Sequence, residues 1–283
     1  MSKPLLGAHV SVAGGFPEGL RRGVELGCEV LQIFVKSPNQ WKAKPIAGED
    51  AAAFRAAHAA SPIGTITAHA AYLINLAATD AEILAKSRAG LTEELERCDV
   101  LGVPGLVVHP GAHLGRGEDE GLTAIAESID SIVAKRLAAP TRILVELTAG
   151  QGSVLGRTLE QLATIRERAR HGDRIGFCLD TCHAFASGYA IETAAGWNDF
   201  LASLEQTIGF ASVQCVHLND SVHEKGSRKD RHENIGQGKI GAEAFRRVLT
   251  ESRFAKVPMI LETPMGDDEL GHARDLATLR ALL

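Results

Sequence analysis

The chain has 283 residues, of which 45% are hydrophobic and 23% charged, and no run of residues approaches the ~18 consecutive apolar residues of a membrane span. Its formal net charge of −5 argues weakly against a nucleic-acid partner, and its five cysteines include no CxxC pair, which argues against a disulfide framework. The N-terminal residues read as a strand rather than as a signal peptide, so we expect a cytoplasmic protein.

Eight short apolar segments are expected to form β-strands. They cover residues 5–10, 30–35, 64–69, 105–109, 142–147, 175–180, 213–218 and 257–262. Near-continuous apolar runs such as Leu106-Val107-Val108 are typical of parallel strands that are covered on both faces. The sequence therefore predicts a parallel sheet.

The segments between these strands carry apolar residues at helical spacing. Examples are Leu91, Leu95, Cys98 and Leu101, then Ile125, Ile129, Ile132 and Val133, and then Leu159, Leu162 and Ile165. The longest connection, from Asn219 to about Ile240, is rich in charge and glycine. With no linker or break in composition, the eightfold alternation predicts a single (β/α)8 TIM barrel domain over residues 1–283 rather than an open doubly wound sheet.

Histidines and carboxylates follow the predicted strands at a nearly regular interval. The nine candidates for metal ligands are His69, His109, Glu146, Asp180, His183, His217, Asp230, His232 and Glu262. The catalytic groups of such barrels sit at the C-terminal ends of the strands, so we expect these side chains to meet there. For one residue alone, such as His69, a structural hydrogen-bonding role is the better reading. The equivalent positions in successive units favour metal binding.

The composition of this set indicates which ions it would hold. Histidines with a minority of carboxylates suit Zn²⁺, Mn²⁺ or Fe²⁺. Nine ligands exceed the three or four protein groups around one catalytic zinc, so we expect two or three ions with a bridging carboxylate. Such a cluster can polarise a phosphoryl oxygen and supply a hydroxide near neutral pH, which is the equipment for phosphoester hydrolysis. A soft-metal role for Cys182, between two candidates, is a weaker alternative to a small buried residue.

Nine segments in chain order resemble the endonuclease IV family of apurinic/apyrimidinic-site endonucleases, and together they cover nearly the whole chain. They are Gly7-Ala-His-Val-Ser11, His69-Ala-Ala-Tyr-Leu-Ile-Asn-Leu76, Val108-His-Pro-Gly-Ala-His113, Glu146-Leu-Thr-Ala-Gly-Gln-Gly152, Leu179-Asp-Thr-Cys-His-Ala-Phe-Ala-Ser-Gly188, Val216-His-Leu-Asn-Asp-Ser221, Asp230-Arg-His232, Asn234-Ile-Gly-Gln-Gly238 and Leu261-Glu-Thr263.

The resemblance implies a (β/α)8 barrel with three divalent metal ions, usually zinc. One ion would be held by His69, His109 and Glu146. Glu146 would bridge to a second ion, which Asp180, His217 and Glu262 complete. The third ion would be held by His183, Asp230 and His232.

The resemblance also implies an activity. The family cleaves the phosphodiester 5′ to abasic sites in duplex DNA, leaves a 3′-hydroxyl and a 5′-deoxyribose phosphate, and removes blocking groups from 3′ ends. Glu262 would orient or deprotonate the nucleophile, and Glu146 would act with it in the catalytic centre. The bound ions would outweigh the negative charge of the chain where DNA binds.

Several residues outside the ligand set are candidates for contacts. Tyr72 and Leu73 match residues of the DNA-inserting loop, and an apolar wedge between base steps is a known way to kink DNA. Asn39, before Gln40, stands where the family commonly has arginine, so distorted DNA would be held differently. Phosphate contacts are expected from four basic residues, although a solvated loop is the alternative: Lys225, Arg228, Lys229 and Arg231. Three residues would support the ligands by hydrogen bonds: His9, Asn219 and Asp220.

Two other functional classes stay open from the sequence. A metal-dependent sugar isomerase or epimerase would use the same barrel, but with typically four ligands around one catalytic ion. The additional trio His183, Asp230 and His232 argues against it. A catalytically silent DNA-binding or metal-storage protein is the other alternative. The resemblance further suggests a monomer.

Overall fold

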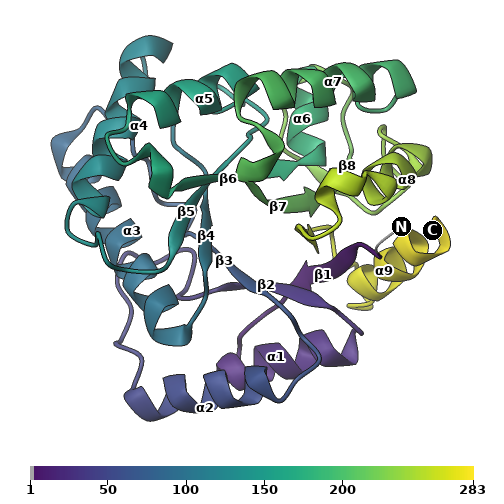
Figure 1. The fold of residues 1–283 in the computed structure, drawn as a ribbon, viewed down its shortest axis with the longest axis horizontal. Helices are drawn as coiled ribbons and strands as arrows, with labels where there is room; N and C mark the ends of the chain where they lie inside the picture. The colour runs from purple at the N-terminus through teal and green to yellow at the C-terminus, as the bar shows by residue number, and fades with distance from the viewer. Residues whose placement is uncertain (1–2) are drawn as a thin grey trace.

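The computed structural model describes residues 3–283, in which eight long strands close into a parallel barrel surrounded by helices (Figure 1). The barrel strands are β1 (Leu5–His9), β2 (Val30–Phe34), β3 (Ile66–His69), β4 (Gly105–Val108), β5 (Arg142–Glu146), β6 (Ile175–Asp180), β7 (Val213–Leu218) and β10 (Pro258–Leu261). Around the barrel they follow the order β1-β10-β7-β6-β5-β4-β3-β2. The predicted TIM barrel is confirmed, and each predicted strand agrees with the observed one to within two residues.

Nine α-helices among the described residues connect and cover the strands. They are α1 (Phe16–Glu25), α2 (Gly48–Ala59), α3 (Ala81–Leu101), α4 (Glu118–Val133), α5 (Leu159–Arg168), α6 (Thr181–Ser187), α7 (Ala194–Thr207), α8 (Ala242–Thr250) and α9 (Gly271–Ala281). The apolar stripes predicted on α3, α4 and α5 are buried against the barrel. Over residues 3–283, no helix combines the length and the apolarity that crossing a membrane requires.

The interior of the barrel is a separate apolar layer. It consists of Val30, Val107, Leu144, Cys178, Cys215 and Ile260, with Leu5 packed against it. Alternate residues of a strand point to the same face. The residue two positions further along each of these six strands therefore also faces inward, one layer nearer the C-terminal end. Those positions are occupied by Gln32, His109, Glu146, Asp180, His217 and Glu262.

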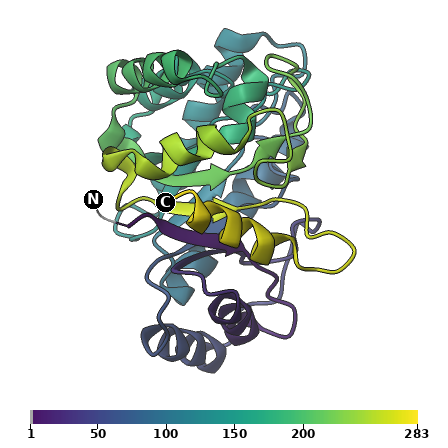
Figure 2. The same cartoon turned by 90° about the vertical axis from the view of Figure 1, so that its right-hand side faces the viewer.

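The C-terminal ends of the strands carry the long connections. In Figure 2 the strand arrows point toward the side from which the long loops project. The longest connection contains a two-stranded ribbon, β8 (Asp220–Ser221) with β9 (His232–Glu233), which the sequence did not predict. The short helix α6 was also not predicted as a separate element.

Candidate metal centre

The nine candidate ligands gather at the C-terminal end of the barrel in three groups. In each group the possible ligand atoms lie within 4.8 Å of one another. The groups are His69 with His109 and Glu146; Glu146 with Asp180, His217 and Glu262; and His183 with Asp230 and His232. A cavity of about 330 Å³ opens over them, lined by residues of all three groups and by Tyr72 and Arg231. These three groups consist of the same residues as the three ligand sets that the family resemblance implies.

The position of His183 depends on a helix cap. Asp180 ends β6 and is the N-cap of α6, where its Oδ1 accepts a hydrogen bond of 2.8 Å from the backbone N–H of His183. One turn of helix therefore places the imidazole of His183 beside the carboxylate of Asp180. Oδ2 of Asp180 accepts a hydrogen bond of 2.6 Å from Nδ2 of Asn219, so both oxygens are fixed.

Backbone carbonyl groups orient three of the imidazole rings. Nδ1 of His69 lies 2.8 Å from the carbonyl oxygen of Ala70. Nδ1 of His183 lies 3.0 Å from the carbonyl oxygen of Leu147, and Nδ1 of His232 lies 3.1 Å from that of Glu262. A carbonyl oxygen only accepts, so each Nδ1 carries a proton, and in the neutral ring the lone pair then lies on Nε2. This arrangement is typical of histidines that bind metals.

The surroundings of two of these Nε2 atoms show whether the donor set suits a metal. In His183 and His232 they are buried and have no hydrogen-bond partner among the described residues. Oδ1 of Asp230 lies 3.2 Å from the first and 3.4 Å from the second. An unsatisfied buried acceptor is costly, whereas a cation between these three groups would satisfy all of them. The donor set therefore fits a divalent ion.

Glu146 lies at the centre of the arrangement and is fully buried. Its Oε2 is 3.2 Å from Nε2 of both His69 and His109, and its Oε1 is 3.2 Å from Nδ1 of His217. Burial alone would raise the pKa of Glu146, but His109, His217 and His183 outweigh it and hold the pKa well below the ordinary value. The residue is therefore a carboxylate with both oxygens directed at candidate ligands of two groups, as a bridge requires.

Hydrogen bonds fix Glu262 and His217 relative to each other, and the residue responsible, Gln32, was missed in the sequence. Its Nε2 donates to Oε1 of Glu262 at 2.6 Å, and its Oε1 lies 2.9 Å from Nε2 of His217. Nδ1 of His9 lies 3.2 Å from the same Oε1 of Glu262. Oδ1 of Asn219 accepts a hydrogen bond from the backbone N–H of Glu262 at 2.9 Å. A polar residue inside the apolar run of residues 30–34 was the available signal for Gln32.

Asp220 has a different position from the one expected. Its carboxylate accepts hydrogen bonds from the backbone N–H groups of Ser221, Gly236, Gly238, Ile240 and Gly241. A Cβ at Gly238 would come within 2.5 Å of Oδ1 of Asp220, so this close approach requires glycine. Asp220 therefore orders the loop that follows His232, and its hydrogen bonds do not go to a candidate ligand.

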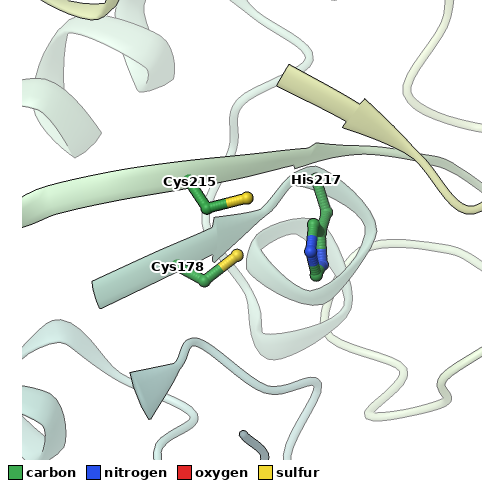
Figure 3. A group of neighbouring side chains, drawn as sticks. All are labelled: Cys178, Cys215 and His217. Atoms are coloured by element: carbon green, nitrogen blue, oxygen red, sulfur yellow. The ribbon is translucent and has the colours of Figure 1, made fainter. Parts of the chain in front are cut away.

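A pair of thiols lies one layer below the centre. Cys178 and Cys215 are register partners on β6 and β7, and their side chains lie side by side, with His217 further along β7 (Figure 3). The three residues have possible ligand atoms within 4.8 Å of one another. Both cysteines belong to the apolar layer inside the barrel, and His217 already faces Glu146, Glu262 and Gln32. We therefore assign the thiols to the barrel core. Cys182, Asp180 and His232 also have possible ligand atoms within 4.8 Å of one another.

Two of the candidate DNA contacts, Tyr72 and Arg231, line the cavity. Tyr72 is 62% exposed and lines the cavity, and Leu73 beside it is half-buried. Asn39 and Gln40 are exposed in the connection between β2 and α2. Arg228, Lys229 and Arg231 are exposed as well, whereas Lys225 forms a 3.0 Å ion pair with Glu192. Backbone bonds from Gly226 to Phe185 and from Arg228 to Ala186 fix this basic loop to α6.

Sequence comparison shows a family match and similar proteins over nearly the whole chain. The family described as "Xylose isomerase-like TIM barrel" matches residues 20–282. A protein named probable endonuclease 4 from Chloroflexus aurantiacus is 46% identical over 280 residues, which cover 99% of this chain and 98% of that protein. One of the same name from Halorhodospira halophila is 48% identical over 281 residues, with 98% and 93% covered.

Solved structures extend the comparison to three dimensions. Endonuclease IV from Thermus thermophilus superposes with a TM-score of 0.87 at 36% identity, over 99% of this chain and 98% of that one. A D-tagatose 3-epimerase-like protein superposes with a TM-score of 0.74 at 18% identity, over 98% and 96%. The second similarity shows the fold alone.

Proposed function

The chain belongs to the endonuclease IV family of hydrolytic DNA endonucleases, and on that premise we propose that it incises duplex DNA at abasic sites. It hydrolyses the phosphodiester 5′ to the lesion and leaves a 3′-hydroxyl and a 5′-deoxyribose phosphate. It also removes blocking groups from 3′ ends. We propose that residues 1–283 act as one barrel domain, and that the protein binds DNA as a monomer.

The observation that carries this proposal is the set of three donor groups joined through Glu146 under one cavity. It supports three divalent ions. We propose zinc, with manganese or iron as alternatives, because five of the nine donors are histidines. When bound, the ions supply Lewis acidity toward the phosphate and lower the pKa of water.

The residues of the chain supply orientation and proton transfer. Gln32 and His9 hold Oε1 of Glu262, while Oε2 of Glu262 lies 3.1 Å from Nδ1 of His217. Glu262 can orient the attacking water and accept its proton, and Glu146 fixes the ligands of two groups. We propose that Tyr72 and Leu73 enter the DNA and that Arg231 pairs with a phosphate, which is supported by the positions of Tyr72 and Arg231 in the cavity wall.

A sugar isomerase or epimerase on the same barrel is the alternative. Such an enzyme needs one catalytic ion, whereas here His183, Asp230 and His232 form a further group with buried, unpartnered nitrogen atoms. We therefore favour the endonuclease. Metal content separates the two hypotheses, because three ions per chain support the endonuclease and one ion supports the isomerase.

Incision of a labelled duplex with one stable abasic analogue tests the proposal, with an intact duplex as the control. We expect a single cut on the 5′ side of the lesion, a 3′-hydroxyl terminus and an uncut control. A second substrate with a 3′-phosphate at a nick tests end cleaning. Absence of any cut by zinc-loaded protein would overturn the proposal and direct attention to sugar substrates.

A further inference from the structure

A buried ion pair joins the end of β2 to helix α3, outside the metal centre. Nζ of Lys36 lies 3.3 Å from Oε1 of Glu94, and each side chain is only 1% exposed. Glu93, the neighbouring acid, lies 3.8 Å from the same Nζ. The cost of removing two charges from water offsets most of their attraction, so such a pair is a poor means of stabilising a fold. The presence of this buried ion pair therefore needs an explanation other than stability.

Each partner also bonds to a different loop. Nζ of Lys36 donates to the backbone carbonyl of Trp41 at 3.0 Å, directly after Asn39 and Gln40. Oε2 of Glu94 accepts from the backbone N–H of Ala71 at 3.1 Å, directly before Tyr72. The ion pair thus connects the two loops that carry the candidate DNA contacts Asn39, Gln40, Tyr72 and Leu73.

Helix α3 holds the first loop at further points on the same face. Glu93 accepts from the backbone N–H of Ala43 at 3.2 Å. Arg97 donates to the carbonyl groups of Val35 at 2.6 Å and Lys44 at 2.8 Å. Residues 90, 93, 94 and 97 lie on one face of the helix at spacings of three and four residues. The indole of Trp41 lies beside Gly90, where a Cβ would be in ordinary van der Waals contact with the ring at 3.6 Å.

We propose that Lys36 and Glu94 are positioning residues that set the distance between the Asn39-Gln40 loop and the Tyr72-Leu73 loop, so that both enter a distorted duplex together. This inference rests on the proposed DNA substrate. Neither residue belongs to the three donor groups, so neither acts on the reacting atoms. A misplacement of about 1 Å in a positioning group is enough to slow a reaction by about 100-fold.

Three variants test the proposal: Lys36→Met and Glu94→Gln, which remove one charge each, and Glu94→Asp, which keeps the charge but is too short to reach both partners. We expect kcat/KM on the abasic duplex to fall about 10- to 100-fold. Hydrolysis of a small activated phosphodiester such as bis(4-nitrophenyl) phosphate, and the metal content, should be unchanged, because they do not require the two loops.

Asp99→Asn is the matched control. Asp99 lies on the same helix and pairs with Arg136, but it bonds to Thr141 at the start of β5, at the opposite end of the barrel. This variant should lower the melting temperature without changing the ratio of duplex to small-substrate activity. Equal loss on both substrates in the Lys36 and Glu94 variants, or no loss on the duplex, would overturn the proposal.

Fluorescence gives a readout that does not depend on activity. The chain has two tryptophans, and Trp197 is buried whereas Trp41 lies in the loop. We expect acrylamide to quench Trp41 more in Glu94→Gln than in the wild type. If the wild type failed to incise abasic DNA, the proposed function would fall, while quenching would still test the link between the loops. Unchanged quenching would overturn the link itself.

Discussion

Glu262 is held on one oxygen by Gln32 and His9 while the other faces His217, so its direction is fixed before any substrate binds. In Glu262→Gln the amide keeps the size and an acceptor for Gln32 but loses the negative charge. We expect single-turnover incision to fall by about 10²- to 10⁴-fold, the range for loss of a general base. DNA affinity, measured by fluorescence anisotropy, should change little. Near-normal turnover would contradict the role of Glu262. The control variant is Glu243→Gln, which changes an exposed residue of α8 and should behave as the wild type.

Gln32 shows why one residue of the centre was missed. Histidines and carboxylates at the ends of strands are the metal-binding signal in the sequence, and Gln32 is neither charged nor at an end. Its role depends on the barrel register, which places it in the same inward layer as His217 and Glu262. Sequence shows that an amide interrupts an apolar run, but only the closed barrel shows what that amide can reach.

Replacement of Gln32 by methionine tests its importance for the ligands. Methionine has a similar length but can neither donate to Glu262 nor accept from His217. We expect zinc affinity, measured by competition with a chelating dye, to fall about 10- to 100-fold, as is usual when a supporting partner of a metal ligand is removed. Unchanged affinity would mean that His217 and Glu262 are oriented by other contacts.

At the scale of elements, the strands and the larger helices were predictable because each buries a regular apolar pattern. The ribbon β8–β9 and helix α6 were not, because neither depends on such a pattern. The ribbon has two residues in each strand and lies beside the loop that Asp220 organises, and α6 begins at the Asp180 cap. The cap of α6 is a local contact, whereas polar contacts between more distant segments hold the ribbon. Together these pieces supply His183 and His232 to the third donor group.

The basic loop at 225–231 leads to a prediction about DNA affinity. Lys229 and Arg231 are exposed near the cavity, while Lys225 is already paired with Glu192. Loss of each phosphate contact reduces the salt slope by about 0.9, so Lys229→Ala with Arg231→Ala should reduce it by about 2 and weaken binding. Lys225→Ala should have a smaller effect. Binding titrations over a range of salt concentrations provide the measurement.

The matched control for this loop removes the same charge elsewhere. Lys135 and Lys256 are exposed in the segments that precede β5 and β10, at the opposite end of the barrel. Lys135→Ala with Lys256→Ala should therefore leave the salt slope unchanged. An equal reduction in both double variants would show that overall charge, rather than this loop, determines DNA affinity.

On the scale of the whole molecule, the sequence predicted the barrel and the end at which its polar groups meet. It could not predict how α3 connects two loops, because the partners of Lys36 and Glu94 are backbone groups of residues that carry no chemical signal of their own, such as Ala71. The structure also separates two layers: an apolar interior that stabilises the barrel, and a layer of crowded carboxylates above it. Histidines lie between these carboxylates, so the second layer offers nitrogen and oxygen donors to cations rather than apolar contacts.

Removal of metal should therefore lower the stability of the protein without unfolding it. The apolar layer and the helix–barrel core do not depend on ions, so far-UV circular dichroism at 25 °C should be unchanged after dialysis against a chelator. The melting temperature should fall because ions that bind only the native barrel no longer stabilise it, and it should recover as zinc is added, with about 1.4 kcal/mol of stability for each bound ion per tenfold rise in free zinc. Glu262→Gln, which has one carboxylate fewer, should show a smaller difference between the metal-free and zinc-loaded forms. An unchanged melting temperature in the wild type would mean that the three groups do not bind ions in the native barrel.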